Sequence, residues 1–245
     1  RAVFAKPILR ALEAEPERWD ISSLRVIVSS GVMWSKESKE GLLRHNPRLI
    51  MVDSLGSSEA IGMATNTTTS ESGGKTAKFE LGPNTRVITD EGTDVVPGSG
   101  ELGRVAQRGR TPVGYYKDDA KSAQTFVTID GDRYSIPGDY ATVEADGTVT
   151  LLGRGSQCIN TGGEKVYPEE VEEALKTHPA VADAAVVGLP DERFGQAITA
   201  LVEARPGATV EAGELVSHVR TTLAAYKSPK HVITVTTIGR APNGK

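Results

Sequence analysis

The sequence is poor in the residues that form disulfides and hold structural metals. Cysteine occurs once, at Cys158, so no internal disulfide can form, which fits a reducing cytoplasm. No histidine lies near it in the sequence, and we expect its thiol to fill a packing position rather than act as a nucleophile. The four histidines have no metal-ligand spacing, and each is expected at the surface or at a helix end: His45, His178, His218 and His231.

Long apolar runs and an excess of basic charge are also missing. The longest apolar stretch, residues 180–189, is strand-sized and interrupted by Asp183 and Gly188, so the sequence predicts no membrane span. The net charge of −4, without basic blocks, argues against nucleic-acid binding. With 38% hydrophobic and 24% charged residues, we expect a cytoplasmic globular protein. Peripheral membrane association and homo-oligomerisation stay open.

Both ends of the sequence predict a fragment. Residues 1–12 have no initiator methionine and no signal-peptide pattern, and they indicate the middle of a helix with Ile8, Leu9 and Leu12 on one face. The sequence stops directly after Asn243-Gly244-Lys245.

The first third of the chain predicts a parallel α/β arrangement. Residues 24–29 form a short apolar run rich in β-branched side chains, typical of a buried strand. A helix is expected over residues 35–45, with its first serine as N-cap and Leu42 and Leu43 facing inward. Residues 49–52 indicate a second buried strand, so strand, helix and strand follow one another.

The middle of the chain, residues 79–152, is rich in glycine and in strand-forming residues. Turns are predicted at Glu91-Gly92 and at Asp146-Gly147, the latter a strong signal for a two-residue hairpin. We expect a distorted antiparallel barrel or meander here.

The last zone alternates helices and strands and predicts a small α+β domain. Helices are expected over residues 168–176 and 215–225, and strands over residues 181–187 and 198–204. The linker at residues 153–157 is polar and holds two glycines, so it can absorb large changes in backbone angle.

Two familiar phosphate-binding patterns can be rejected. Residues 98–103 satisfy G-x-G-x-x-G, but a strand is predicted directly after them, where a dinucleotide site requires a helix. Gly74-Lys75-Thr76 looks like the end of a phosphate loop, yet the required first glycine is replaced by Thr69. Residues 70–78 therefore predict a mobile surface loop. The sequence also has no G-x-S-x-G motif, so no motif supports the chemistry of a serine hydrolase.

Residues 53–59 carry hydroxyls, a glycine and a carboxylate directly after a predicted buried strand, where open α/β sheets bind ligands. The serines of this segment could hold phosphate oxygens, and Glu59 could hold a magnesium ion. The alternative, favoured for this segment taken alone, is a loop-to-helix junction with Ser57 or Ser58 as N-cap.

Three further segments have a chemical interpretation beside an ordinary one. Asp139, after Gly138, could accept hydrogen bonds from both hydroxyls of a ribose, or be a turn residue. Arg154 lies at the flexible linker and is followed by a Gly-Gly pair and a helix. Lys245, on a glycine-containing turn, could neutralise phosphate charge or be an ordinary surface lysine.

Taken in this order, the segments resemble the adenylate-forming superfamily of acyl-CoA synthetases, adenylation domains and firefly-type luciferases. The resemblance covers nearly the whole chain, and it is carried by the ordered set rather than by one motif. Residues 159–172 and 115–118 look most similar to actinobacterial fatty-acid–CoA ligases. The matching motifs are Ser29-Ser30-Gly31-Val32-Met33, Leu55-Gly56-Ser57-Ser58-Glu59, Gly100-Glu101-Leu102, Gly114-Tyr115-Tyr116, Thr125-Phe126, Gly138-Asp139, Gly153-Arg154 through Glu172, and Pro242-Asn243-Gly244-Lys245.

The resemblance implies a fold, substrates and residue roles. The fold would be α/β, with residues 1–154 ending a large adenylate-forming domain that includes a distorted β-barrel, and residues 155–245 forming a small mobile α+β domain. The reaction would be an ATP-dependent ligation of a carboxylic acid, a fatty or steroid side-chain acid, to coenzyme A through an acyl-adenylate. Mg²⁺ would be held by Glu59, and the catalytic residues would be Glu59 and Lys245. ATP and CoA would be bound by Gly31, Val32, Asp53, Ser54, Leu55, Gly56, Ser57, Ser58, Asp139, Arg154, Gly162, Gly163 and Lys165.

This sequence departs from the family's pattern at several points. Leu55 stands where relatives often have an aromatic residue, so we expect adenine stacking at this position to be lost. Ser156 replaces a frequent Asp or Lys at the hinge, and Asn160 replaces a frequent lysine. The family's Ser/Thr/Gly-rich phosphate loop does not occur in these 245 residues, so we expect the isolated chain to be inactive. An enzyme that loads an acyl carrier protein, and a non-catalytic nucleotide- or acyl-binding module, remain alternatives.

Overall fold

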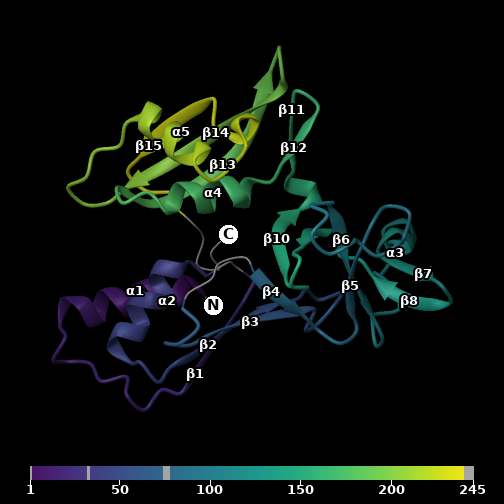
Figure 1. Cartoon of the computed structure of the whole chain (residues 1–245), viewed down its shortest axis with the longest axis horizontal. Helices are drawn as coiled ribbons and strands as arrows, with labels where there is room; N and C mark the ends of the chain where they lie inside the picture. The colour runs from purple at the N-terminus through teal and green to yellow at the C-terminus, as the bar shows by residue number, and fades with distance from the viewer. Residues whose placement is uncertain (1, 32–33, 74–77, 240–245) are drawn as a thin grey trace. The chain divides into compact units, whose positions relative to one another are not determined.

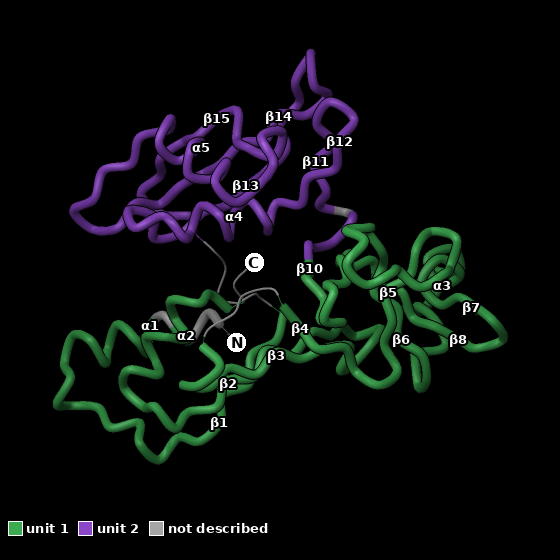
Figure 2. Tube along the Cα trace, viewed as in Figure 1, with its two compact units in different colours: residues 1–151, 240–245 green, residues 152–239 purple. Residues whose placement is uncertain are grey.

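The computed structural model describes residues 2–31, 34–73 and 78–239, which form two compact units (Figure 2). One unit comprises the residues up to Leu151, and the other runs from Leu152 to Gly239. Within these described ranges, no helix is both long enough and apolar enough to cross a bilayer.

The first unit opens with two helices packed on two parallel strands (Figure 1). Their bounds are α1 (Ala2–Ala14), β1 (Val26–Ser30), α2 (Lys36–His45) and β2 (Ile50–Leu55). The strands pair in parallel from Val26 opposite Ile50 to Ser30 opposite Ser54, which confirms the predicted order of strand, helix and strand.

Helix α2 forms where its sequence predicts it. The hydroxyl of Ser35 caps the helix by accepting a hydrogen bond from the Ser38 N–H at 3.4 Å. Leu42 is fully buried and Leu43 packs partly against the same core, as expected.

The faces predicted for the first helix and the first strand need correction. Ile8 is 41% exposed, because the buried stripe of α1 runs through Ala5, Leu9 and Leu12 instead. Strand β1 is buried on one face only: its side chains alternate across the sheet, and those on the helix-covered side are the ones that pack. Val28, for example, is 59% exposed on the face opposite to Ile27.

The rest of the first unit is a largely antiparallel sheet, as predicted. The strand order β1-β2-β3-β4-β10-β9-β6-β8-β7 does not follow the chain, so the described strands are not a simple meander. β5 pairs with β6. The turn predicted after β9 forms, but its loop holds three residues, 145–147, rather than two: the Glu144 N–H donates to the Thr148 carbonyl at 2.8 Å, and the Gly147 N–H donates to the Glu144 carbonyl at 2.9 Å. The remaining elements are β3 (Ala64–Thr68), β4 (Lys78–Leu81), β5 (Thr85–Ile88), β6 (Gly103–Arg108), α3 (Asp119–Thr125), β7 (Phe126–Ile129), β8 (Asp132–Ser135), β9 (Asp139–Val143) and β10 (Val149–Arg154).

The second unit packs two helices on a small, mostly antiparallel sheet, confirming the predicted α+β character. Val171 and Leu175 of α4 and Leu215 and Val219 of α5 are buried against the strands. Its elements are the 3₁₀ turn η1 (Gly155–Gln157), β11 (Ile159–Thr161), β12 (Glu164–Val166), α4 (Pro168–Lys176), β13 (Val181–Asp191), β14 (Gly195–Ala204), α5 (Ala212–Arg220), η2 (Ala225–Lys227) and β15 (His231–Val235).

Helix α5 ends earlier than the apolar pattern predicted. It stops at Arg220 rather than residue 225, and the hydroxyls of Thr221 and Thr222 donate to the carbonyls of His218 and Val219. These side chains cap the last turn, where two β-branched residues disfavour continuation.

Candidate functional site

The carboxyl ends of the two parallel strands meet at one edge of the sheet and leave a hollow there. Ser30 and Ser54 lie opposite each other in the β1–β2 register. Together with Gly56, Ser57, Ser58, Ile61 and Gly62 they line an open pocket of about 360 Å³. Ligands of open α/β sheets bind at this edge, so the hydroxyl-lined pocket is the candidate site.

A tight turn after β2 presents the serines. The Ser57 N–H donates to the Ala60 carbonyl at 2.8 Å, and the Glu59 N–H donates to the Ser57 hydroxyl at 3.2 Å. A Cβ on Gly56 would lie 3.1 Å from the Ala60 carbonyl oxygen, so glycine allows this close approach. No helix follows within residues 56–63, and the alternative interpretation of Ser57 or Ser58 as an N-cap is therefore wrong.

Glu59 is oriented by a residue far away in the sequence. The Tyr115 hydroxyl donates a hydrogen bond of 2.6 Å to Glu59 Oε1. Tyr115 lies in the segment between β6 and α3, and the only sequence signal for it was its place in the Gly114-Tyr115-Tyr116 motif. Among the residues that the structure describes, no group of three or more His, Cys, Asp and Glu could hold a metal. Glu59 lies in the same turn as the serines, and its carboxylate suits Mg²⁺, which commonly takes one or two carboxylates with waters and phosphates.

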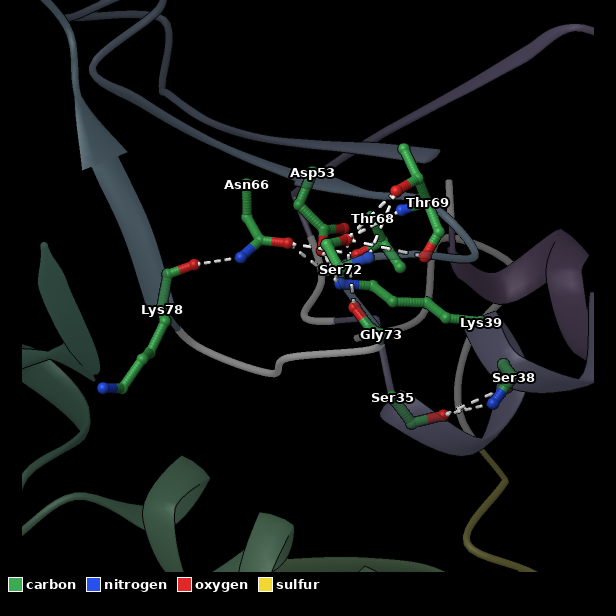
Figure 3. Close-up of polar contacts among 10 residues, drawn as sticks. All are labelled: Ser35, Ser38, Lys39, Asp53, Asn66, Thr68, Thr69, Ser72, Gly73 and Lys78. Carbon is green, nitrogen blue, oxygen red and sulfur yellow. Dashed lines mark hydrogen bonds and ion pairs between the residues drawn. The ribbon is translucent and has the colours of Figure 1, made fainter. Parts of the chain in front are cut away.

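Asp53 forms a buried ion pair with a lysine of α2 for which no role was predicted from the sequence (Figure 3). Lys39 Nζ of α2 lies 2.5 Å from Asp53 Oδ2, and the lysine side chain is 0% exposed. Asn66 of β3 accepts a further hydrogen bond from this ammonium at 3.4 Å. Burial raises the pKa of the Asp53 carboxyl above its ordinary value, and Lys39 counteracts part of this rise.

Asp53 and the next residue in the strand, Ser54, lie on opposite faces of the sheet. Side chains alternate along β2, so Asp53 lies on the helix-covered face with Met51, and Ser54 lies on the face that lines the pocket. The nucleotide-binding role of Asp53 stays a prediction.

Asp139 is the first residue of β9 and is 7% exposed, so it is not a solvated turn residue. Gly138 precedes it with φ of +96°, a conformation in which glycine carries no Cβ penalty. The predicted ribose role of Asp139 is compatible with this rigid, buried start of a strand and stays a prediction.

The second unit contains the other predicted residues. Arg154 ends β10, and the predicted hinge at Ser156 lies in the 3₁₀ turn that follows. Gly162 and Gly163 form the two-residue turn between β11 and β12, with φ of +60° and +88°. Such a turn requires positive φ at both positions. Lys165 lies opposite Asn160 in this hairpin and is exposed.

Two predicted residues, Val32 and Lys245, lie outside the described residues, whereas Gly31 is described with φ of +85°.

Cys158 is half-buried, and burial raises the pKa of its thiol, in line with a packing role. His178 follows the end of α4 but is buried, where its Nε2 lies 3.2 Å from Glu214 Oε1.

Comparison with known proteins accounts for nearly the whole chain. Residues 170–245 match the AMP-binding enzyme C-terminal domain family. A medium/long-chain-fatty-acid–CoA/3-oxocholest-4-en-26-oate–CoA ligase of Mycobacterium tuberculosis is 49% identical over 243 residues, which are 99% of this chain and 44% of that protein. A 3-oxocholest-4-en-26-oate–CoA ligase of Rhodococcus rhodochrous is 51% identical over 250 residues, again covering 99% of this chain and 44% of that protein. The chain is a homologue of these adenylate-forming CoA ligases.

Solved structures of adenylate-forming ligases have the same fold. The anthranilate–CoA ligase AuaEII, in complex with anthranoyl-AMP, superimposes with a TM-score of 0.79 at 25% identity over 100% of this chain and 51% of its own. The o-succinylbenzoate–CoA synthetase of Bacillus subtilis, bound to its acyl-adenylate, gives a TM-score of 0.71 at 26% identity over 98% and 48%. The resemblance and fold class predicted from the sequence are confirmed, and the chain spans about half the length of the relatives it matches.

Proposed function

We propose that the protein carrying this chain activates a fatty or steroid side-chain carboxylic acid with ATP and transfers the acyl group to coenzyme A. The observation that carries the proposal is the 49% to 51% identity to fatty-acid and 3-oxocholestenoate CoA ligases along 99% of the chain. The serine-lined pocket at the carboxyl ends of β1 and β2 supports it, because hydroxyls and backbone N–H groups suit phosphate oxygens.

In the first step, the substrate carboxylate attacks the α-phosphorus of ATP, pyrophosphate leaves, and an acyl-adenylate forms. We assign Ser58 to the α-phosphate, Asp139 and Arg154 to the ribose and nearby phosphate, and Lys245 to the reacting oxygens. Glu59 would hold magnesium, which neutralises phosphate charge when it is bound. The protein contributes mainly positioning and electrostatic stabilisation to this in-line displacement.

In the second step, the CoA thiol attacks the acyl carbonyl carbon and AMP leaves. We propose that residues 155–245 rotate about Arg154 to Ser156 between the steps, withdrawing Lys245 from the site. The Gly162-Gly163 turn would then line the passage for the pantetheine arm, with Lys165 close by.

The test is pyrophosphate release by the full-length protein with ATP, magnesium and a panel of medium-chain, long-chain and steroid side-chain acids. Acid-dependent release with acyl-CoA formation supports the ligase and identifies its substrate. Release with transfer only to an added acyl carrier protein would indicate a carrier-loading enzyme instead. A folded protein that releases no pyrophosphate with any acid would contradict the proposal.

Replacing Gly163 by asparagine should block the second step and spare the first. Asparagine tolerates positive φ better than other side chains, and a Cβ added at this position would meet no described atom within 4 Å, so the fold should persist. We expect acyl-CoA formation from supplied acyl-adenylate to fall by about tenfold or more, as for a misplaced reactant. Adenylation, measured by pyrophosphate exchange, should stay near normal.

Gly147→Asn is the matched control for this substitution. Gly147 has φ of +81° in the hairpin loop between β9 and β10, where an added Cβ would also meet no described atom within 4 Å. This variant should retain both half-reactions. An unchanged second step in Gly163→Asn would argue against a CoA passage beside the turn.

A further inference from the structure

The hydrogen bond between Tyr115 and Glu59 joins two loops that are 56 residues apart in the sequence. At 2.6 Å it is as short as hydrogen bonds from a hydroxyl to a charged carboxylate usually are. Bonds of this kind are about twice as strong as neutral ones. The contact therefore orients the Glu59 carboxylate from outside its own turn.

Tyr115 is itself fixed by the start of α3. Its N–H donates to the Ser122 hydroxyl at 2.7 Å, and this hydroxyl donates to the Asp118 carbonyl at 2.6 Å. The ring packs on Phe126 with 5.7 Å between centroids. A Cβ on Gly114 would lie 2.9 Å from the Ser122 hydroxyl oxygen, so the backbone can approach the helix only with glycine at this position.

The environment of the ring also strengthens Tyr115 as a donor. Lys121 Nζ lies 4.2 Å from the ring centroid, within the range of a cation–π contact. A cation over the ring face draws electron density from the phenol and polarises its O–H bond. A neighbouring hydrogen bond then becomes stronger by the same polarisation that makes hydrogen-bonded chains cooperative.

We propose that Tyr115 is a positioning residue that holds the Glu59 carboxylate in the orientation required for magnesium. The proposal rests on the proposed metal role of Glu59. Carboxylates that ligate metals are commonly hydrogen-bonded by a second residue, and loss of that residue typically costs about 10- to 100-fold in metal affinity or activity. Lys121 and Ser122, through their contacts with Tyr115, make α3 part of the support for the site.

The experiment measures ATP binding by the full-length protein without turnover, in the absence of any acid substrate. ATP affinity is determined by titration calorimetry once with saturating magnesium and once with the metal chelated. The metal coupling is the dissociation constant of ATP without metal divided by that with magnesium. It depends on how well the protein holds the metal–nucleotide complex. Tyr115→Phe keeps the ring and removes only the hydroxyl, so we expect it to reduce this ratio by about tenfold. Metal-free ATP affinity should remain unchanged.

Tyr116→Phe is the matched control, because Tyr116 is adjacent and 88% exposed. It should leave the metal coupling unaltered. In a protein that already carries Glu59→Gln, adding Tyr115→Phe should change the coupling no further, because the carboxylate it orients is gone. Thermal unfolding of each variant checks that the fold is retained.

Three results would overturn the proposal. Equal losses of ATP affinity with and without metal would make Tyr115 a structural residue only. A larger coupling in Tyr115→Phe would mean that the phenol competes with the metal for Glu59. If the unsubstituted protein binds ATP equally well with and without magnesium, the metal role of Glu59 fails and the positioning role fails with it. This last result appears before any substitution is made, which separates it from the first two.

Discussion

Lys39→Met is expected to lower the free energy of unfolding of the first unit by about 3–5 kcal/mol, the usual cost of removing one partner of a buried ion pair. The Lys39 side chain is 0% exposed and lies 2.5 Å from Asp53 Oδ2. Methionine fills the space of the aliphatic stem but leaves the Asp53 carboxylate buried without its counter-charge. The exposed pairs Lys36–Glu40 of α2 and Arg108–Asp132 at the end of β6, by contrast, should contribute little.

Tryptophan fluorescence during chemical denaturation measures this effect in the right part of the chain. Both tryptophans, Trp19 and Trp34, belong to the first unit, and Trp34 is buried in the core shared by α1, α2 and β2. The signal therefore follows the unit that contains the ion pair. Lys36→Met is the matched control, because Lys36 lies on the same helix with a side chain that is 64% exposed. It should change stability by less than about 0.5 kcal/mol.

The pH dependence of the Lys39→Met defect has a definite sign. Burial already raises the pKa of Asp53 above its ordinary value of 3.8, and without Lys39 it should rise further. A raised pKa in the folded state makes stability fall as pH rises from the unfolded value through the folded one. The difference between variant and parent should therefore be smaller near pH 4 than near pH 8.

The double variant Lys39→Met/Asp53→Leu tests the cause of the defect. Replacing both charges by apolar side chains of similar size is often neutral, so much of the lost stability should return. If the double variant is less stable than Lys39→Met alone, the ion-pair explanation is wrong.

Lys245→Ala should separate the two half-reactions in the opposite sense from Gly163→Asn. We expect adenylation to fall by at least about 100-fold, because one charge-stabilising group is lost from the step in which charge concentrates on phosphate. Thioester formation from supplied acyl-adenylate should proceed, since the lysine is proposed to leave the site before CoA reacts. Pyrophosphate exchange and acyl-CoA formation from purified adenylate, measured on the full-length protein, check the two steps.

Gly163→Asn serves as the reciprocal control for Lys245→Ala. Equal losses of both half-reactions in Lys245→Ala would refute the proposal that Lys245 serves the first step and leaves the site before the second. Intact adenylation would remove Lys245 from the chemistry altogether.

Local features were predictable because they depend on residues close together in the chain. The Ser35 cap of α2, the Asp146-Gly147 turn and the start of α4 at Pro168 follow from capping chemistry and positive φ. The order of motifs was enough to indicate the superfamily, and the comparisons confirmed it. The early end of α5 was missed because a threonine cap interrupts an apolar pattern that continues to Leu223.

The residues around the candidate site were decided by tertiary structure. Residues 53–59 favoured an N-cap when taken alone, yet the chain turns back toward β3 without forming a helix. No role was predicted for Lys39 from the sequence, and only the packing of α2 on β2 places it beside Asp53. Tyr115 meets Glu59 because the sheet brings the end of β6 near the turn after β2.

The sequence by itself therefore determined most of the local elements and the motifs, which depend on residues a few positions apart, and the order of those motifs along the chain indicated the superfamily. Tertiary structure alone decided which charged groups share a buried space and which hydroxyl orients the carboxylate proposed to hold magnesium. Such contacts join residues that are 14 and 56 positions apart. Both contacts form only after the chain has packed, and packing also gives the Lys39–Asp53 pair the low-dielectric surroundings that strengthen it.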